Sequence, residues 1–80
     1  MGSYNNIGHN VVIGKNCIIT ASCVLCGSSN LGNNVFVGPK SMIKDAIAIP
    51  NNTIIGGMTF VNKIFNQENL TLIGSPAKKL

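Results

Sequence analysis

The sequence predicts an all-β fold, a single-stranded parallel β-helix in which six-residue repeats wind into triangular coils. From Ile7 to Val61 every sixth residue is Ile, Leu or Val, ten positions in succession. These types fill 22 of the 80 positions, so chance yields such a column in one frame with a probability on the order of 10^-6. A period of six also does not follow the 3.6-residue turn of an α-helix. Glycine often follows the column, where we expect it to turn the backbone sharply: Gly8, Gly14, Gly32, Gly38 and Gly56.

Each repeat divides into a three-residue strand and a three-residue turn. In residues 11–13 alternation points Val11 and Ile13 inward and Val12 outward. Residues 14–16, Gly-Lys-Asn, have the composition of a turn. Three strands and three turns close one coil of 18 residues, and coils stack about 4.8 Å apart, the spacing of strands in a sheet.

The repeat occupies most of residues 1–80, which we interpret as one domain of about three to four coils. Complete coils are predicted at 7–24, 25–42 and 43–60. Residues 62–72 leave the pattern and are predicted to form a loop, and 73–80 return as a strand and terminal arm, with Ile73 back in phase. Because the frame already runs at Met1, we expect no N-terminal domain for binding an acceptor.

The outward strand positions predict contact with other subunits. Two faces carry six large apolar residues, which water disfavours as a contiguous patch: Ile18, Phe36, Ile54, Val24, Met42 and Phe60. The third face carries Val12, Asn30 and Ala48. We expect a homotrimer, since a closed ring suits a prism with two covered faces. The alternative is that Met42 and Phe60 are scattered exposed residues.

Composition excludes several classes of function. The net charge of +4 comes from scattered lysines without interleaved aromatic residues, so no nucleic acid partner is expected. No run of about 18 apolar residues predicts a membrane span, and no signal peptide is visible, so a cytoplasmic location is predicted. Cys17 and Cys23 fill an inward column of small residues, and the one C-x-x-C, Cys23 and Cys26, lacks further ligands; no metal site is predicted.

Three segments resemble the hexapeptide-repeat acyltransferases: "IGHNVVIGKNCII", "CGSSNLGNNVFVG" and "LIGSPAKKL". The first two resemble the sugar acyltransferase branch, which includes UDP-amino-sugar acetyltransferases and lipid A UDP-3-O-acyl-glucosamine N-acyltransferases. The last is more similar to the closing arm of the acetyl-CoA-dependent members. The resemblance implies a left-handed β-helix, a trimer and transfer of an acyl group to an amine or hydroxyl of a sugar or small molecule.

The same resemblance implies site residues. His9 matches the histidine of an I-x-H-N/D motif that acts as general base, and imidazole titrates near neutral pH as that role requires. Gly27 follows His9 by one full coil, so its N–H is expected to face a developing oxyanion. In some relatives a carboxylate next to the histidine, or nearby, orients the ring, whereas here Asn10, a backbone carbonyl or a neighbouring subunit must do so. Asp45 is two coils away, roughly 10 Å along the stack.

For the acyl donor, the resemblance implies acetyl-CoA bound by turn residues of the neighbouring subunit. Pro39 and Gly57, one coil apart in the sequence, are the predicted contacts of the pantetheine arm, and Lys78 is predicted to meet the coenzyme phosphates. Whether coenzyme A or an acyl carrier protein carries the acyl group stays open, as does N- against O-acylation. The alternative function is a non-catalytic trimeric scaffold or a truncated remnant of such an enzyme.

Overall fold

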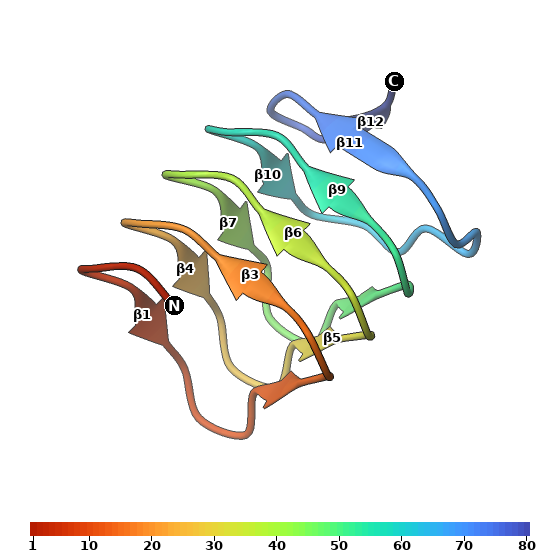
Figure 1. Ribbon diagram of the computed structural model, residues 1–80. Coiled ribbons are helices and arrows are strands. Elements are labelled where there is room, and N and C mark those ends of the chain that lie inside the picture. The colour runs from red at the N-terminus through yellow and green to blue at the C-terminus, as the bar shows by residue number, and fades with distance from the viewer.

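The computed structural model describes residues 1–80 and consists of short strands joined by tight turns (Figure 1). Ten strands recur at intervals of six residues: β1 (Asn6–Ile7), β2 (Val12–Ile13), β3 (Ile18–Ile19), β4 (Val24–Leu25), β5 (Asn30–Leu31), β6 (Phe36–Val37), β7 (Met42–Ile43), β8 (Ala48–Ile49), β9 (Ile54–Ile55) and β10 (Phe60–Val61). Two more, β11 (Thr71–Ile73) and β12 (Lys78–Lys79), follow after a loop. The structure has no helix that could span a membrane.

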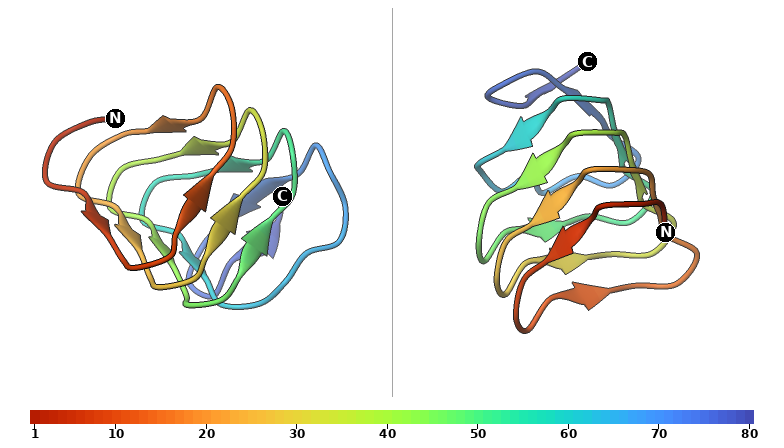
Figure 2. Two further views of the ribbon diagram at one scale, coloured as in Figure 1. Left: turned by 90° about the horizontal axis from the view of Figure 1, so that it is seen from below. Right: turned by 90° about the vertical axis from the view of Figure 1, so that its left-hand side faces the viewer.

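The strands form three sheets, one on each side of a triangular stack. Sheet A has the order β1-β4-β7-β10, sheet B has β2-β5-β8, and sheet C has β12-β11-β9-β6-β3. Partners along the first ten strands are parallel and lie one coil, or three hexads, apart in the sequence, as in Asn6 with Val24. Seen from the N-terminal end, the chain turns anticlockwise as it recedes (Figure 2, right), so the helix is left-handed. The predicted parallel β-helix is confirmed.

Three corners join the sheets, and their residues matter for the site. We call residues 8–10, 26–28 and 44–46, between sheets A and B, the His9 corner. Residues 14–16, 32–34 and 50–52, between sheets B and C, form the Asn33 corner. Residues 20–22, 38–40 and 56–58, between sheets C and A, form the Pro39 corner, whereas residues 74–76 join β11 to β12 within sheet C.

The Ile, Leu and Val residues at every sixth position form the core, but the two ends of this column differ in how far they are buried. Leu25, Val37 and Ile55 are fully buried, whereas Ile7 in the first coil is 37% exposed because no coil lies beneath it. At the other end the chain closes the stack with Leu72 and Ala77, both buried. The end nearest His9 is therefore the less covered one.

The predicted role of the glycine column is wrong. The backbone enters the left-handed region two residues later, at every sixth position, as at Asn10 (φ 57°) and Asn16 (φ 59°). Asparagine tolerates this conformation better than most residues. Glycine is needed instead because coils approach closely: a Cβ on Gly8 would lie 2.7 Å from the Gly27 nitrogen, and one on Gly38 2.6 Å from the Gly57 nitrogen.

The C-terminal segment also differs from its predicted boundaries. Strand β11 begins at Thr71, inside the predicted 62–72 loop, and pairs in parallel with β9. Leu72 lies beside Ile55, in the place that the period assigns to Ile73. The loop thus shifts the phase by one position, so Leu72 fills the core and Ile73 is exposed. Strand β12 then folds back antiparallel to β11.

Candidate functional site

His9 and Gly27 lie against each other at the His9 corner. The imidazole is exposed and extends over the next coil. A Cβ built on Gly27 would lie 2.9 Å from His9 Nε2 and 3.2 Å from Cδ2 and Cε1. The space that a side chain at position 27 would fill is therefore the space the ring uses, and only glycine leaves both in place.

Asn10 contacts the other ring nitrogen. Its amide Nδ2 lies 3.2 Å from His9 Nδ1, and the left-handed backbone at Asn10 brings this short side chain to the ring. A neutral imidazole carries one proton, so the group that Asn10 presents selects the tautomer. In the orientation shown, the Nδ2–H donates to Nδ1 and the ring proton lies on Nε2; with the amide turned over, Oδ1 accepts the Nδ1–H and leaves Nε2 as the free base. Of the three orienting groups left open by the sequence, the structure brings Asn10 to the ring.

The backbone N–H of Gly27 has no hydrogen-bond acceptor in the structure. Its carbonyl accepts the Ala46 N–H at 3.0 Å, and its neighbour Ser28 donates to the His9 carbonyl at 2.9 Å. The peptide is thus fixed by the adjoining coils while its donor stays free. A free, fixed N–H beside an imidazole is a pair of groups suited to a carbonyl that develops negative charge.

Pro39 and Gly57 lie together at the Pro39 corner. A Cβ on Gly57 would be 3.4 Å from the Pro39 carbonyl oxygen and 3.5 Å from its Cδ, an ordinary contact distance. This corner borders sheet A on the side away from the His9 corner. Within one chain, the structure therefore does not bring Pro39 and Gly57 to His9.

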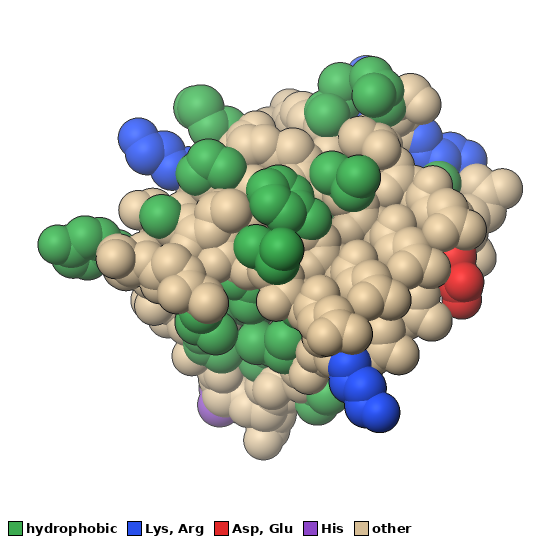
Figure 3. Space-filling view, in the orientation of Figure 1, with side chains coloured by type: hydrophobic (Ala, Val, Ile, Leu, Met, Phe, Trp, Pro, Cys, Tyr) green, Lys and Arg blue, Asp and Glu red, His purple; other side chains and the backbone are tan.

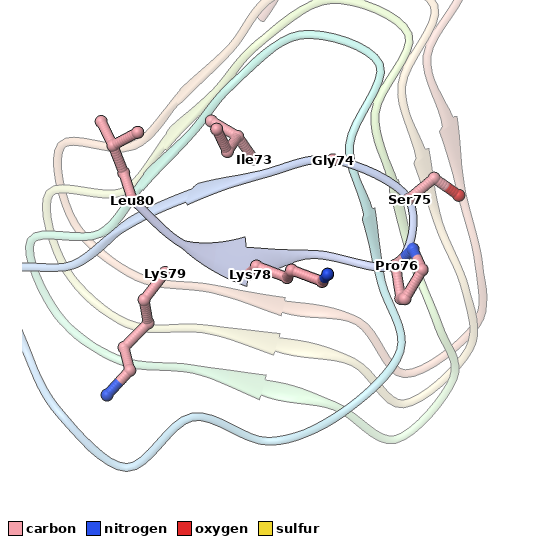
Figure 4. Close-up of a pocket in the computed structure, with 7 residues that line it drawn as sticks. All are labelled: Ile73, Gly74, Ser75, Pro76, Lys78, Lys79 and Leu80. Carbon is pink, nitrogen blue, oxygen red and sulfur yellow. The ribbon is translucent and has the colours of Figure 1, made fainter.

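Lys78 lies at the C-terminal end of the stack, beside a shallow cavity of about 470 Å³ lined by residues 73–76 and 78–80. In Figure 4 its side chain extends toward Pro76, whereas Lys79 points the other way, where its Nζ donates to Gln67 Oε1 at 3.1 Å. Lys78 makes no ion pair with an acidic residue. His9 is in the first coil, so these two residues are at opposite ends of the molecule.

Few other ionisable groups are near the site. Asp45, in the third layer of the His9 corner, pairs with Lys44, whose Nζ lies 3.3 Å from Asp45 Oδ1. No three His, Cys, Asp or Glu side chains are grouped as a metal ion would require. Asp45 is two coils from His9 and too far to orient the imidazole, but it follows Gly27 by one coil, and this spacing in the sequence relates it to the glycine.

Apolar side chains gather on the faces predicted to meet other subunits. Ile18, Phe36 and Ile54 on sheet C and Met42 on sheet A are exposed, and Val24 and Phe60 are half-buried. Figure 3 shows hydrophobic side chains clustered over the middle of the face that carries β3, β6 and β9. Sheet B exposes one large apolar residue, Val12, beside Asn30 and Ala48.

Comparisons with known proteins identify relatives of this chain in sequence and in structure. No model of a protein family matches the chain. UDP-3-O-acylglucosamine N-acyltransferase 1 of Sulfurimonas denitrificans is 31% identical over 70 residues, which are 88% of this chain and 22% of that protein. The corresponding enzyme of Campylobacter lari is 41% identical over 56 residues, 66% of this chain and 18% of that protein. The chain thus spans about a fifth of the length of these curated relatives.

A solved structure supports the fold. The S84A mutant of AntD, an N-acyltransferase from Bacillus cereus in complex with dTDP-4-amino-4,6-dideoxyglucose and coenzyme A, superposes with a TM-score of 0.90. The superposition covers 99% of this chain and 57% of AntD at 15% identity. Together with the two sequence relatives, it confirms the resemblance to the hexapeptide-repeat sugar acyltransferases.

Proposed function

We propose that the chain transfers an acyl group, acetyl in the first instance, from coenzyme A to an amino or hydroxyl group of a sugar or similar small molecule. The observation that carries this proposal is the placement of the His9 ring over Gly27, whose N–H is free. A base and an oxyanion donor next to each other serve acyl transfer. The names of the sequence relatives and the ligands of AntD support the sugar acceptor and the coenzyme A donor.

The chemistry follows from these groups. His9 Nε2 takes a proton from the acceptor as its nitrogen or oxygen forms a bond to the thioester carbonyl carbon. The carbonyl oxygen becomes an oxyanion, to which Gly27 N–H donates. When the carbon–sulfur bond breaks, the imidazolium returns the proton to the departing thiolate. For this step the Asn10 amide turns over from the orientation in the structure, so that Oδ1 accepts the Nδ1–H and Nε2 is left free as the base.

The donor site in this proposal lies between two subunits of a homotrimer. Pro39 and Gly57 border the pantetheine arm, and Lys78 meets the coenzyme phosphates as a mobile positive charge. These residues and His9 belong to different corners and ends of one protomer, so a complete site requires a neighbour. The exposed residues of sheets A and C support such an assembly. A cytoplasmic location remains a prediction.

The direct test is titration of acetyl-CoA by calorimetry, followed by a thiol-release assay with amino-sugar nucleotides as acceptors. His9→Ala is expected to retain coenzyme binding and to lose turnover by about 10²- to 10⁴-fold, the usual contribution of a general base. His9→Gln, which keeps a similar polar side chain, controls for packing over Gly27. Turnover equal to wild type in both variants would exclude His9 as the base while leaving acyl transfer intact.

The same titration separates the enzyme from the alternative, a non-catalytic β-helix or remnant. That alternative is favoured by Asn10, which stands where some relatives have a carboxylate. No coenzyme binding at millimolar concentration would support the alternative and contradict the enzyme.

Subunit mixing tests whether the site is shared. His9→Ala and Gly57→Arg each remove turnover in a pure trimer, since one lacks the base and the other fills the turn beside Pro39. Mixed trimers contain some interfaces in which both groups are wild type. Recovery of turnover on mixing is therefore expected, and no recovery in trimers shown to be mixed would place the whole site in one chain.

A further inference from the structure

At the Asn33 corner, asparagine side-chain oxygens accept hydrogen bonds from backbone N–H groups of the preceding coil, and we call this series of bonds the ladder. The Lys15 N–H donates to Asn33 Oδ1 at 2.9 Å, and the Asn33 N–H donates to Asn51 Oδ1 at 2.7 Å. In both cases the acceptor follows the donor by one coil along the stack. A side-chain oxygen at this position of the turn thus covers the N–H of the coil before it.

The His9 corner has the same backbone geometry. The Ala46 N–H donates to the Gly27 carbonyl at 3.0 Å, as the Asn52 N–H donates to the Asn33 carbonyl at 2.8 Å. Ala46 and Asn52 also share the left-handed conformation, with φ of 60° and 59°. Asp45 therefore holds the position relative to Gly27 that Asn51 holds relative to Asn33.

Asp45 nevertheless leaves the Gly27 N–H free. Its Oδ1 lies 3.3 Å from Lys44 Nζ, in a pair that is well exposed on both sides, and Gly27 N–H has no acceptor. A carboxylate accepts hydrogen bonds at least as well as the amide of Asn51. The two corners differ here in sequence, Lys44-Asp45 against Pro50-Asn51, and in the structure the Asp45 carboxylate contacts Lys44 instead of joining the ladder.

We propose that Asp45 is a positioning residue that gates the Gly27 N–H. Paired with Lys44, it leaves this donor available to the oxyanion; turned onto Gly27, it occupies the donor and places negative charge where the reaction develops negative charge. The inference rests on the proposed function for the role of the N–H, but the contact itself depends only on the ladder geometry. Lys44 accordingly acts through Asp45 rather than on the substrate.

The test combines amide hydrogen exchange of Gly27, followed by NMR, with turnover. Asp45→Asn introduces the side chain that closes the ladder at Asn51, so we expect exchange of the Gly27 amide to slow by about tenfold. We expect kcat to fall by about three- to tenfold, because the oxyanion loses about the net free energy of its one hydrogen bond from Gly27 N–H. KM for acetyl-CoA is expected to stay unchanged. Lys44→Met is expected to act in the same direction, whereas Lys44→Arg keeps both values near wild type.

The matched control is Lys44→Met combined with Asp45→Ala, which has no carboxylate to move. This variant is expected to recover fast Gly27 exchange and wild-type kcat. Unchanged Gly27 exchange in Asp45→Asn, or a double variant as slow as Lys44→Met alone, would overturn the gate. Slowed exchange with unaltered turnover would also overturn it. If the wild-type trimer binds no acetyl-CoA and shows no turnover, the proposed function itself fails, whereas turnover with unaltered exchange defeats only the gate.

Discussion

Replacing Gly27 with alanine is expected to abolish most turnover without unfolding the protein. The added Cβ would lie 2.9 Å from His9 Nε2, whereas ordinary contact begins at 3.4 Å. The ring must therefore retreat by a few tenths of an ångström or more at that atom. It is able to do so because the His9 side chain is exposed and is held only through Asn10.

The Gly27→Ala substitution is expected to change the free energy of unfolding less than it changes turnover. Gly27 is not among the residues with positive φ, so alanine fits its backbone, and reduced freedom of the unfolded chain contributes about 0.4–1 kcal/mol of stability. We expect the free energy of unfolding to stay within about 1 kcal/mol of wild type. Misplacing a catalytic group by about 1 Å costs on the order of 10²-fold in rate, about 2.7 kcal/mol of transition-state stabilisation. The retreat that the Cβ requires is about half as large, so we expect turnover to fall by about tenfold.

The assay is kcat by thiol release, alongside thermal unfolding at one fixed protomer concentration. Gly8→Ala is the matched control, since its Cβ would lie 2.7 Å from the Gly27 nitrogen and 3.0 Å from its Cα. These are backbone atoms that cannot swing away, so this variant should lose about 1–3 kcal/mol of stability. A Gly27→Ala protein that keeps a third of wild-type turnover, or that melts as early as Gly8→Ala, would refute the reasoning.

Three further predictions concern the stack and its assembly. Asn33→Ala removes a ladder acceptor, so urea denaturation should show a loss of about 1 kcal/mol. Ser29→Ala should leave stability unchanged or higher, because Ser29 Oγ is buried without a partner; Ser41→Ala should cost about 1–2 kcal/mol because its Oγ donates at 2.7 Å to a backbone carbonyl. Ile54→Lys on sheet C should dissociate the trimer in sedimentation, whereas Ala48→Lys on sheet B should not; a trimer that survives Ile54→Lys would contradict the proposed interface.

The fold was predictable because one number, the period of six, fixes strand, turn and stacking together. Once three hexads close a coil, every residue has a neighbour one coil further along the chain, and the pairing of Asn6 with Val24 follows. The shift at β11 was not predictable from the column, because Leu72 and Ile73 are both large apolar residues. The length of the preceding loop decides which of them turns inward, and a period carries no information about a segment that interrupts it.

The role of the glycines was misjudged for a related reason. Glycine permits both a left-handed backbone and a close approach of chains, and the sequence does not say which of the two is needed. The structure separates them: Asn10 and its equivalents take the left-handed conformation, and Gly8 takes the close contact with the next coil. The contact between His9 and Gly27 was predictable because it needs only the coil length, whereas the carboxylate at Asp45 depends on the direction of one side chain.

The spacing of the coils also limits what a single chain can do. Groups one coil apart are separated by about 4.8 Å, so a side chain on one coil and an N–H on the next can both lie about 3 Å from one reacting atom, as we propose for His9 and Gly27. Groups two coils apart are separated by roughly 10 Å, and groups at another corner lie across the width of a sheet. In the proposed site, Pro39, Gly57 and Lys78 lie too far from His9 of their own chain and come from a second chain. If the protein is an acyltransferase, loss of the trimer and loss of turnover must coincide, even for a variant such as Ile54→Lys that leaves the His9 corner untouched.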